Sequence, residues 1–143
     1  MKKMNNKGFS LVELIVVVLI MAIIAVALAP QVMKWVENSR LSTDCETYDG
    51  LIANIQVALT DKCAYAEMKN SSTSFSIGVN GTSGASGKTA LQAALNQVNP
   101  QWANAKKKVS AGSDYTIGVS GDGTTINVSR TLAPDTSSNS DLS

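Results

Sequence analysis

The chain has 143 residues, with 12 basic and 11 acidic side chains and no histidine. This balance lacks the strong positive charge that bulk nucleic-acid binding needs, so nucleic acid is not an expected partner. The lack of histidine excludes histidine-based acid–base catalysis and histidine metal sites. The sequence also shows no nucleophile–base pair, phosphate loop or metal-ligand cluster. We therefore predict a protein that is not an enzyme and needs neither metal nor cofactor.

Three lysines, Lys2, Lys3 and Lys7, precede an apolar segment that runs to Ala29. Counted from Phe9, the segment has about 21 residues, or roughly 31 Å of helix, which is enough to span a bilayer. Because these three lysines lie before the segment and no lysine lies inside it, the N-terminus is expected to stay in the cytoplasm and the rest of the chain to lie outside. About 100 residues then remain for one small domain.

Glu13 is the odd residue of this segment, because a carboxylate near lipid is costly and needs a reason. One interpretation is a secretory signal peptide, cleaved after Ala27 or Ala29. Another is a plain signal anchor that is never cleaved. Neither of these interpretations explains Glu13.

A third interpretation uses every unusual residue. The run from Gly8 and Phe9 to Glu13, with its short basic leader and with Pro30 further on, resembles the prepilin signature of type IV pilins, type II secretion pseudopilins and competence pilins. The resemblance covers roughly residues 2–40. It implies that a dedicated prepilin peptidase cleaves between Gly8 and Phe9 and N-methylates Phe9. The apolar segment then remains on the mature protein.

The same resemblance implies an organisation and a life cycle. Residues 1–8 form a cleaved leader, residues 9–30 a hydrophobic transmembrane and assembly helix, and residues 31–143 a soluble pilin head that includes the C-terminal half of the long helix. The subunit is expected to be a single-pass cytoplasmic membrane protein, and then part of an extracellular homopolymer, the pilus, on a bacterial surface. An assembly platform and a motor ATPase are the implied partners. A major pilin serving adhesion and surface motility is the favoured function, with a pseudopilin or a DNA-uptake competence pilin as alternatives.

Glu13 and Pro30 are the expected assembly residues. The resemblance implies that Glu13 of one subunit pairs with the Phe9 amine of a neighbour, which relieves two costly buried charges. Alternatively, Glu13 only reaches the cytoplasmic interface. Pro30 has no N–H to bond the carbonyl of Val26, so a kink or a melted stretch is expected upstream of it. Alternatively, Pro30 only marks the exit from the membrane.

The pattern beyond Pro30 predicts an α+β fold, in which one long helix from Phe9 to about Leu59 packs on a small, mainly antiparallel sheet. The helix should bury one stripe, while Asp44 is assigned to another face. The head is expected to contain a strand at 74–79, a loop at 81–87, a helix at 89–98, and a hairpin of strands at 114–119 and 125–129. Segments 75–81 and 115–121 are similar, which two strands packed in one sheet explain, with a duplication as the alternative. The predicted stripe consists of Leu41, Cys45, Tyr48, Ile52, Ile55 and Leu59.

Three weaker signals each have a simpler alternative. Cys45 and Cys63 could form a disulfide if the chain turns near residues 60–62, or Cys45 could be a free buried thiol. The lysines at 106–108 could touch DNA but are more typical of a solvated loop. Residues 120–124 could suggest a calcium loop, but one local carboxylate favours a turn.

Overall fold

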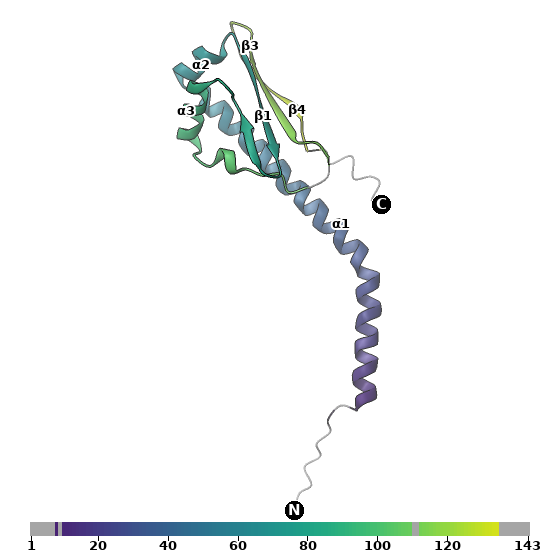
Figure 1. Cartoon of the computed structure of the whole chain (residues 1–143). Coiled ribbons are helices and arrows are strands. Elements are labelled where there is room, and N and C mark those ends of the chain that lie inside the picture. The colour runs from purple at the N-terminus through teal and green to yellow at the C-terminus, as the bar shows by residue number, and fades with distance from the viewer. Residues whose placement is uncertain (1–7, 9, 110–111, 135–143) are drawn as a thin grey trace, which may run out of the picture. The chain divides into compact units, whose positions relative to one another are not determined.

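The computed structural model describes residues 8, 10–109 and 112–134. These residues divide into two compact parts, one ending at Val36 and one beginning at Glu37, and each is described by itself. Helix α1 (Leu11–Ala58) contributes to both parts (Figure 1). The predicted helix from Phe9 to about Leu59 is therefore confirmed over its described length, while Phe9 lies outside the described residues.

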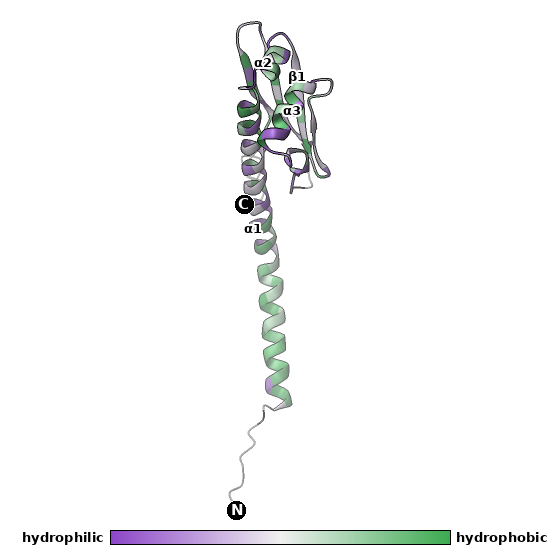
Figure 2. Cartoon of the chain, turned by 90° about the vertical axis from the view of Figure 1, so that its left-hand side faces the viewer, coloured by the Kyte–Doolittle hydropathy of each residue, from purple (hydrophilic) through white to green (hydrophobic). Residues whose placement is uncertain are grey.

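The first part is a single apolar stretch of α1. All side chains from Leu11 to Met33 are exposed, and Figure 2 shows hydrophobic residues along almost all of this stretch, apart from a hydrophilic patch near its start. The stretch is long and apolar enough to cross a membrane. Since it is apolar on every side, it has no polar face to turn toward water.

Pro30 lies inside α1, which continues through it without interruption. Of the two outcomes expected upstream of Pro30, a melted stretch is therefore wrong for the isolated subunit, while a kink stays a prediction. A proline removes one backbone hydrogen bond and crowds one turn. A helix of 48 residues keeps its remaining bonds on both sides of that turn.

The second part is built on a four-stranded antiparallel sheet in the order β2-β1-β3-β4. Strands β1 (Ser72–Gly78) and β3 (Tyr115–Gly121) lie in one sheet, as the similarity of their sequences predicted, and are neighbours in it. Strand β4 (Ile126–Leu132) pairs with β3, which confirms the predicted hairpin. The α+β arrangement of a long helix on a small antiparallel sheet is thus confirmed.

Strand β2 (Gly81–Gly84) corrects the predicted loop at 81–87. It pairs with β1 across a turn that contains Val79 and Asn80. Gly81 and Gly84 have φ values of 141° and 156°, in a region that a side chain would strain. Glycine makes this twisted edge strand possible, and the same glycines make its sequence look like a loop.

Three short helices complete this part (Figure 1). Helix α3 (Thr89–Val98) has the predicted bounds, whereas helix α2 (Lys62–Met68) and the 3-10 helix η1 (Trp102–Asn104) were not predicted. Asp61 caps α2 by accepting the N–H groups of Cys63 and Ala64. This side-chain cap is what lets so short a helix begin directly after α1.

The core lies between one sheet face and the C-terminal half of α1. The buried positions on α1 repeat with the predicted spacing, but three of them, Asp44, Leu51 and Ala58, lie one residue before the predicted positions. Leu41, Cys45, Ile52 and Leu59 are consequently only half-buried. The buried side chains of α1 are Asp44, Tyr48, Leu51, Ile55 and Ala58. The inner strand residues are Phe75, Ile77, Tyr115, Ile117 and Val119.

Candidate membrane and assembly segment

The first turn of α1 is closed by two reciprocal hydrogen bonds. The backbone N–H of Ser10 donates to Glu13 Oε2 at 3.0 Å, and the N–H of Glu13 donates to Ser10 Oγ at 3.3 Å. This is a capping box, in which two side chains satisfy N–H groups that the helix leaves free at its start. In the subunit Glu13 therefore has a local role that the sequence analysis did not consider.

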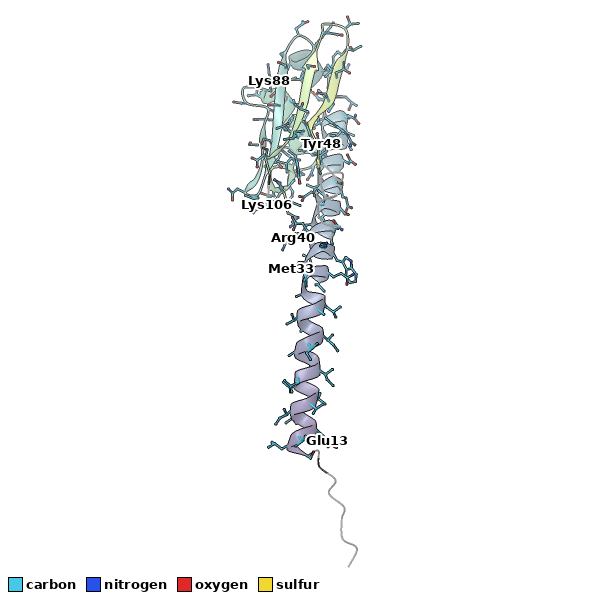
Figure 3. The ribbon with its side chains drawn as sticks, turned by 90° about the vertical axis from the view of Figure 1, so that its right-hand side faces the viewer. Glu13, Met33, Arg40, Tyr48, Lys88 and Lys106 are labelled. Atoms are coloured by element: carbon cyan, nitrogen blue, oxygen red, sulfur yellow. The ribbon has the colours of Figure 1, made fainter. Side chains whose placement is uncertain are left out.

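Glu13 and Lys34 are the only charged residues of α1 before Glu37. Figure 3 shows Glu13 at the start of the helix, with the side chains that follow projecting from all sides of the ribbon. Each backbone group in the helix interior is paired within the helix, apart from those affected by Pro30. Such a segment is stable in lipid, because its backbone needs nothing from the surroundings.

Beyond Val36, the polar contacts of α1 centre on Asp44, which is only 2% exposed. Its carboxylate accepts the N–H of Lys108 at 2.6 Å, the N–H of Val109 at 3.0 Å and the hydroxyl of Tyr115 at 3.0 Å. The prediction that Asp44 lies on another face of the helix is wrong. Three donors compensate for the burial of the charge, and the contact ties the helix to β3 and to the chain before it.

Lys107 is 5% exposed and corrects the prediction of a fully solvated lysine loop. Its ammonium donates to the carbonyl oxygens of Gly112 and Ser113, both at 2.9 Å, and lies 5.0 Å from the centroid of the Tyr115 ring. Lys106 and Lys108 are exposed. The middle lysine of the run thus supports the fold, and only its two neighbours face solvent.

We compared the chain with known proteins. The family model of the prokaryotic N-terminal methylation motif matches residues 3–29. The chain carries the prepilin signature of type IV pilins and pseudopilins. No curated protein and no solved structure matches the chain.

The prepilin signature supports a pilin-like or pseudopilin-class protein, which is a structural class, with a membrane-anchored precursor. Within the signature, Gly8 is exposed and precedes the helix, and Phe9 lies outside the described residues. Glu13 and Pro30 are both on α1, in its first turn and its interior. Cleavage at Gly8, methylation of Phe9 and the assembly roles of Glu13 and Pro30 remain predictions.

In the part of the chain after Val36, two tyrosines, Tyr48 and Tyr115, have raised pKa values. Their rings pack edge to face, 6.3 Å apart, and Tyr48 Oη donates to the carbonyl of Thr116 at 2.8 Å. Burial raises the pKa of both phenols above 10.0. The hydrogen bond to Asp44 raises the pKa of Tyr115 further. Both groups are therefore neutral donors at physiological pH.

The two cysteines are free thiols, Cys45 half-buried on α1 and Cys63 exposed on α2. The structure does not join them in the candidate disulfide, and Cys45 is a free thiol that is half-buried and not fully buried as the alternative expected. The chain does turn after α1, as a disulfide would require, but Cys63 follows that turn at once. About 20 Å of helix still separates Cys45 from the end of α1, so the two Cα atoms are too far apart for a bond.

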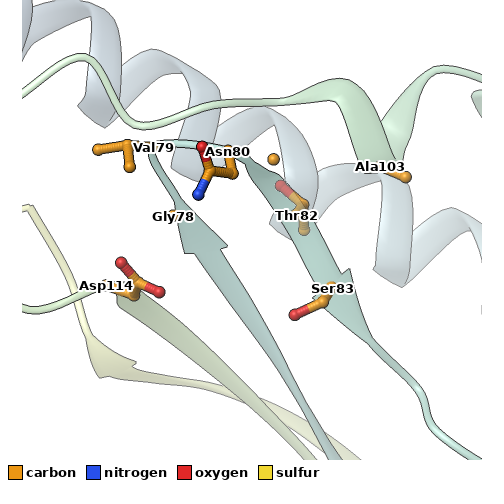
Figure 4. Close-up of a pocket in the computed structure, with 8 residues that line it drawn as sticks. Gly78, Val79, Asn80, Thr82, Ser83, Ala103 and Asp114 are labelled. Atoms are coloured by element: carbon orange, nitrogen blue, oxygen red, sulfur yellow. The ribbon is translucent and has the colours of Figure 1, made fainter.

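Two other features of the head, the turn at Asp122 and a hollow at the β1–β2 turn, do not bring several reactive side chains together. Asp122 accepts the N–H groups of Thr124 and Thr125, and these bonds lower the pKa of its carboxyl. It therefore forms a turn, as predicted. A shallow hollow of roughly 440 Å³ lies at the β1–β2 turn (Figure 4). Among the residues that line it, Asp114 is the one ionisable group.

The residues missed from the sequence are Ser10, Asp44 and Lys107. Ser10 and Glu13 have the spacing of a capping box, so this pair could have been found. Asp44 lies four residues before Tyr48 and seven before Leu51, which is the spacing of the buried stripe. That spacing was a usable signal, but the charge of Asp44 argued against burial.

Proposed function

We propose that the protein is a structural subunit of a type IV pilus, most simply its major pilin, and not an enzyme. The observation that supports this most strongly is the prepilin signature, directly followed by a helix that is apolar on all sides. A soluble head with its own core then completes the subunit. Adhesion and surface motility are the functions such a filament serves.

Processing begins with cleavage between Gly8 and Phe9 by a prepilin peptidase and N-methylation of Phe9. Gly8 is exposed and non-helical, as a peptide must be to enter a protease site. The basic leader stays in the cytoplasm and the head lies outside. A platform protein and a motor ATPase then add the subunit to a homopolymer, which extends from the cell surface.

Within the polymer, the Glu13 carboxylate forms an ion pair with the Phe9 amine of a neighbouring subunit. The free subunit keeps Glu13 at the helix start through Ser10, so little rearrangement is needed to present the carboxylate. Pro30 lies where one turn lacks a backbone bond, and this turn is where the helix lengthens most easily under load. The proposed roles of Glu13 and Pro30 both require that the subunit polymerises.

Intact mass and N-terminal sequencing of sheared surface material test this proposal. A chain that begins at methylated Phe9 in filaments supports the pilin. The same start in membranes alone favours a pseudopilin, and a start after Ala27 or Ala29 overturns the proposal in favour of an ordinary secreted protein.

Glu13→Gln separates the two roles of Glu13. Glutamine also serves in a capping box, so the helix start is preserved, but the negative charge is lost. We expect Glu13→Gln to be processed and exported yet to fail to polymerise. Ser10→Ala is the matched control, because it removes a capping oxygen and keeps the charge. Filaments of normal yield from Glu13→Gln would contradict the charge pairing.

The competence-pilin alternative needs an exposed basic surface. With Lys107 held by backbone carbonyls, only Lys106 and Lys108 of the run remain exposed. If the protein binds DNA there, Lys106→Ala with Lys108→Ala should abolish a salt-sensitive affinity. We expect no such affinity.

A further inference from the structure

The apolar part of α1 is bracketed by charge at a distance that fits a bilayer. Glu13 and Lys34 are separated by 21 positions on an uninterrupted helix, which is about 32 Å. The hydrocarbon core of a typical bilayer is about 30 Å thick. All residues between the two, Pro30 included, are uncharged and all but one are apolar.

Trp35 stands directly beside Lys34 and is 63% exposed. Its neighbours Val32, Met33 and Val36 are exposed as well, so the apolar surface does not stop at Pro30. An indole with one polar N–H and a large apolar ring prefers the headgroup level of a membrane. A lysine beside it extends its ammonium to the lipid phosphates while its stem stays in apolar surroundings.

We propose that Lys34 and Trp35 anchor the precursor at the outer headgroup layer of the phospholipid bilayer, so that the membrane boundary lies there and not at Pro30. This rests on the membrane-anchored precursor of the proposed function and assigns two positioning residues to it. Pro30 then lies inside the bilayer, about 6 Å of helix below Lys34.

The anchor has a consequence for the other end of the helix. With Lys34 fixed at the outer boundary, Glu13 lies at the inner boundary of the hydrocarbon core. Ser10 and Gly8 precede Glu13 and lie outside the helix, at the level of the inner headgroups. The outer anchor therefore sets the depth of the bond between Gly8 and Phe9.

Fluorescence quenching in vesicles tests the anchor. The unprocessed full-length chain is reconstituted in phosphatidylcholine–phosphatidylglycerol vesicles whose acyl chains carry bromine either near the headgroup or near the terminal methyl. The second tryptophan, Trp102, is buried in the head. Its fluorescence is measured in the Trp35→Phe variant and subtracted from that of the unchanged protein. The measurement needs no peptidase and no filament, and its result is therefore independent of cleavage and polymerisation.

We expect Trp35 to be quenched several-fold more strongly by the shallow bromine than by the deep one. The matched control places the reporter lower, as Leu28→Trp in the Trp35→Phe background. Position 28 lies seven positions before position 35, about 10 Å deeper in the bilayer, and the preference should reverse. Both results together support the anchor.

Two outcomes overturn the proposal. If Trp35 is quenched by aqueous iodide and by neither lipid, the boundary lies at or before Pro30. If Trp35 is insensitive to lipid and to iodide, it is covered by protein, and a second copy of the chain is the occupant of this surface.

Discussion

Asp44 is stable as a buried carboxylate because its two oxygens accept three donors from outside the helix. The neighbouring cation, Lys107, is held by carbonyl oxygens in the same way. Tyr115 touches both, donating to Asp44 and lying under the Lys107 ammonium. These side chains form a small polar cluster that fixes how α1 and the chain before β3 meet.

The cluster predicts a large effect for one substitution. Asp44→Ala should lower the free energy of unfolding by about 3 kcal/mol, because it leaves buried donors without an acceptor. Asp49→Ala is the matched control, since Asp49 pairs with Arg130 at an exposed site and should cost at most about 1 kcal/mol. Urea unfolding of the full chain in detergent, followed by near-UV circular dichroism, measures both. Equal effects would contradict the role of the cluster.

A second prediction concerns the tyrosines. Because burial raises the pKa of Tyr48 and Tyr115 above 10.0, the folded protein should form less tyrosinate at pH 10 to 11 than the protein in urea. Tyrosinate absorbance during an alkaline titration measures this. Tyr115→Phe should remove the phenol that ionises last. A titration curve that urea leaves unchanged would contradict the burial of these two groups.

At this scale the sequence predicted apolar burial better than polar burial. Tyr48 and Ile55 were placed on the buried stripe from their spacing alone, and both are buried. Asp44 and Lys107 were not, because their burial depends on partners at least five positions away in the chain. Helical spacing is consistent with Asp44 on the buried face of α1, but it does not show which donors would satisfy a buried charge.

Among the helices and strands, those in which hydrophobic residues recur with a clear period were predicted. Those that depend on a cap or a turn were not. Helix α3 and the β3–β4 hairpin follow from their sequences. Helix α2 has only 7 residues and depends on the Asp61 cap, and β2 has only 4 residues, two of them glycine. The Asp61 cap is local, but a helix or strand this short is also stabilised by tertiary contacts, which a local pattern does not contain.

Alanine substitutions at two glycines, Gly121 and Gly50, should change the stability of the protein in opposite directions. A Cβ at Gly121 would lie under 3.0 Å from the carbonyl oxygens of Met68 and Lys69 at the end of α2. Gly121→Ala should therefore destabilise the head by about 2 kcal/mol. Gly50 in α1 has open space around it, and Gly50→Ala should stabilise by up to about 1 kcal/mol. Thermal unfolding of both variants checks the signs. Stabilisation by Gly121→Ala would mean that the hairpin does not rest on α2.

For the whole molecule, the sequence predicted the long helix, its apolar first part and the small antiparallel sheet on which its C-terminal half packs. The packing of the head did not follow, because it depends on sheet order and on which residues of α1 are buried. The order β2-β1-β3-β4 arises from pairings between segments that the chain separates by about 40 residues.

The stability of the head should fall at alkaline pH. A raised folded-state pKa means that Tyr48 and Tyr115 favour the folded state fully below pH 10.0, and that this contribution is lost as pH rises through their folded pKa values. Urea midpoints measured between pH 8 and 12 should decline above pH 10. Tyr115→Phe should flatten this decline, and an unchanged slope in that variant would contradict the linkage.

The polar cluster also sets an order of events during synthesis. Asp44 leaves the ribosome 64 to 71 residues before the three donors that satisfy it. Until β3 has been made, α1 can be complete and inserted while its buried face is still in water. The C-terminal half of α1 is thus made long before β3 can pack on it, and a nascent chain interrupted before Tyr115 would lack the strand that covers the buried face of α1.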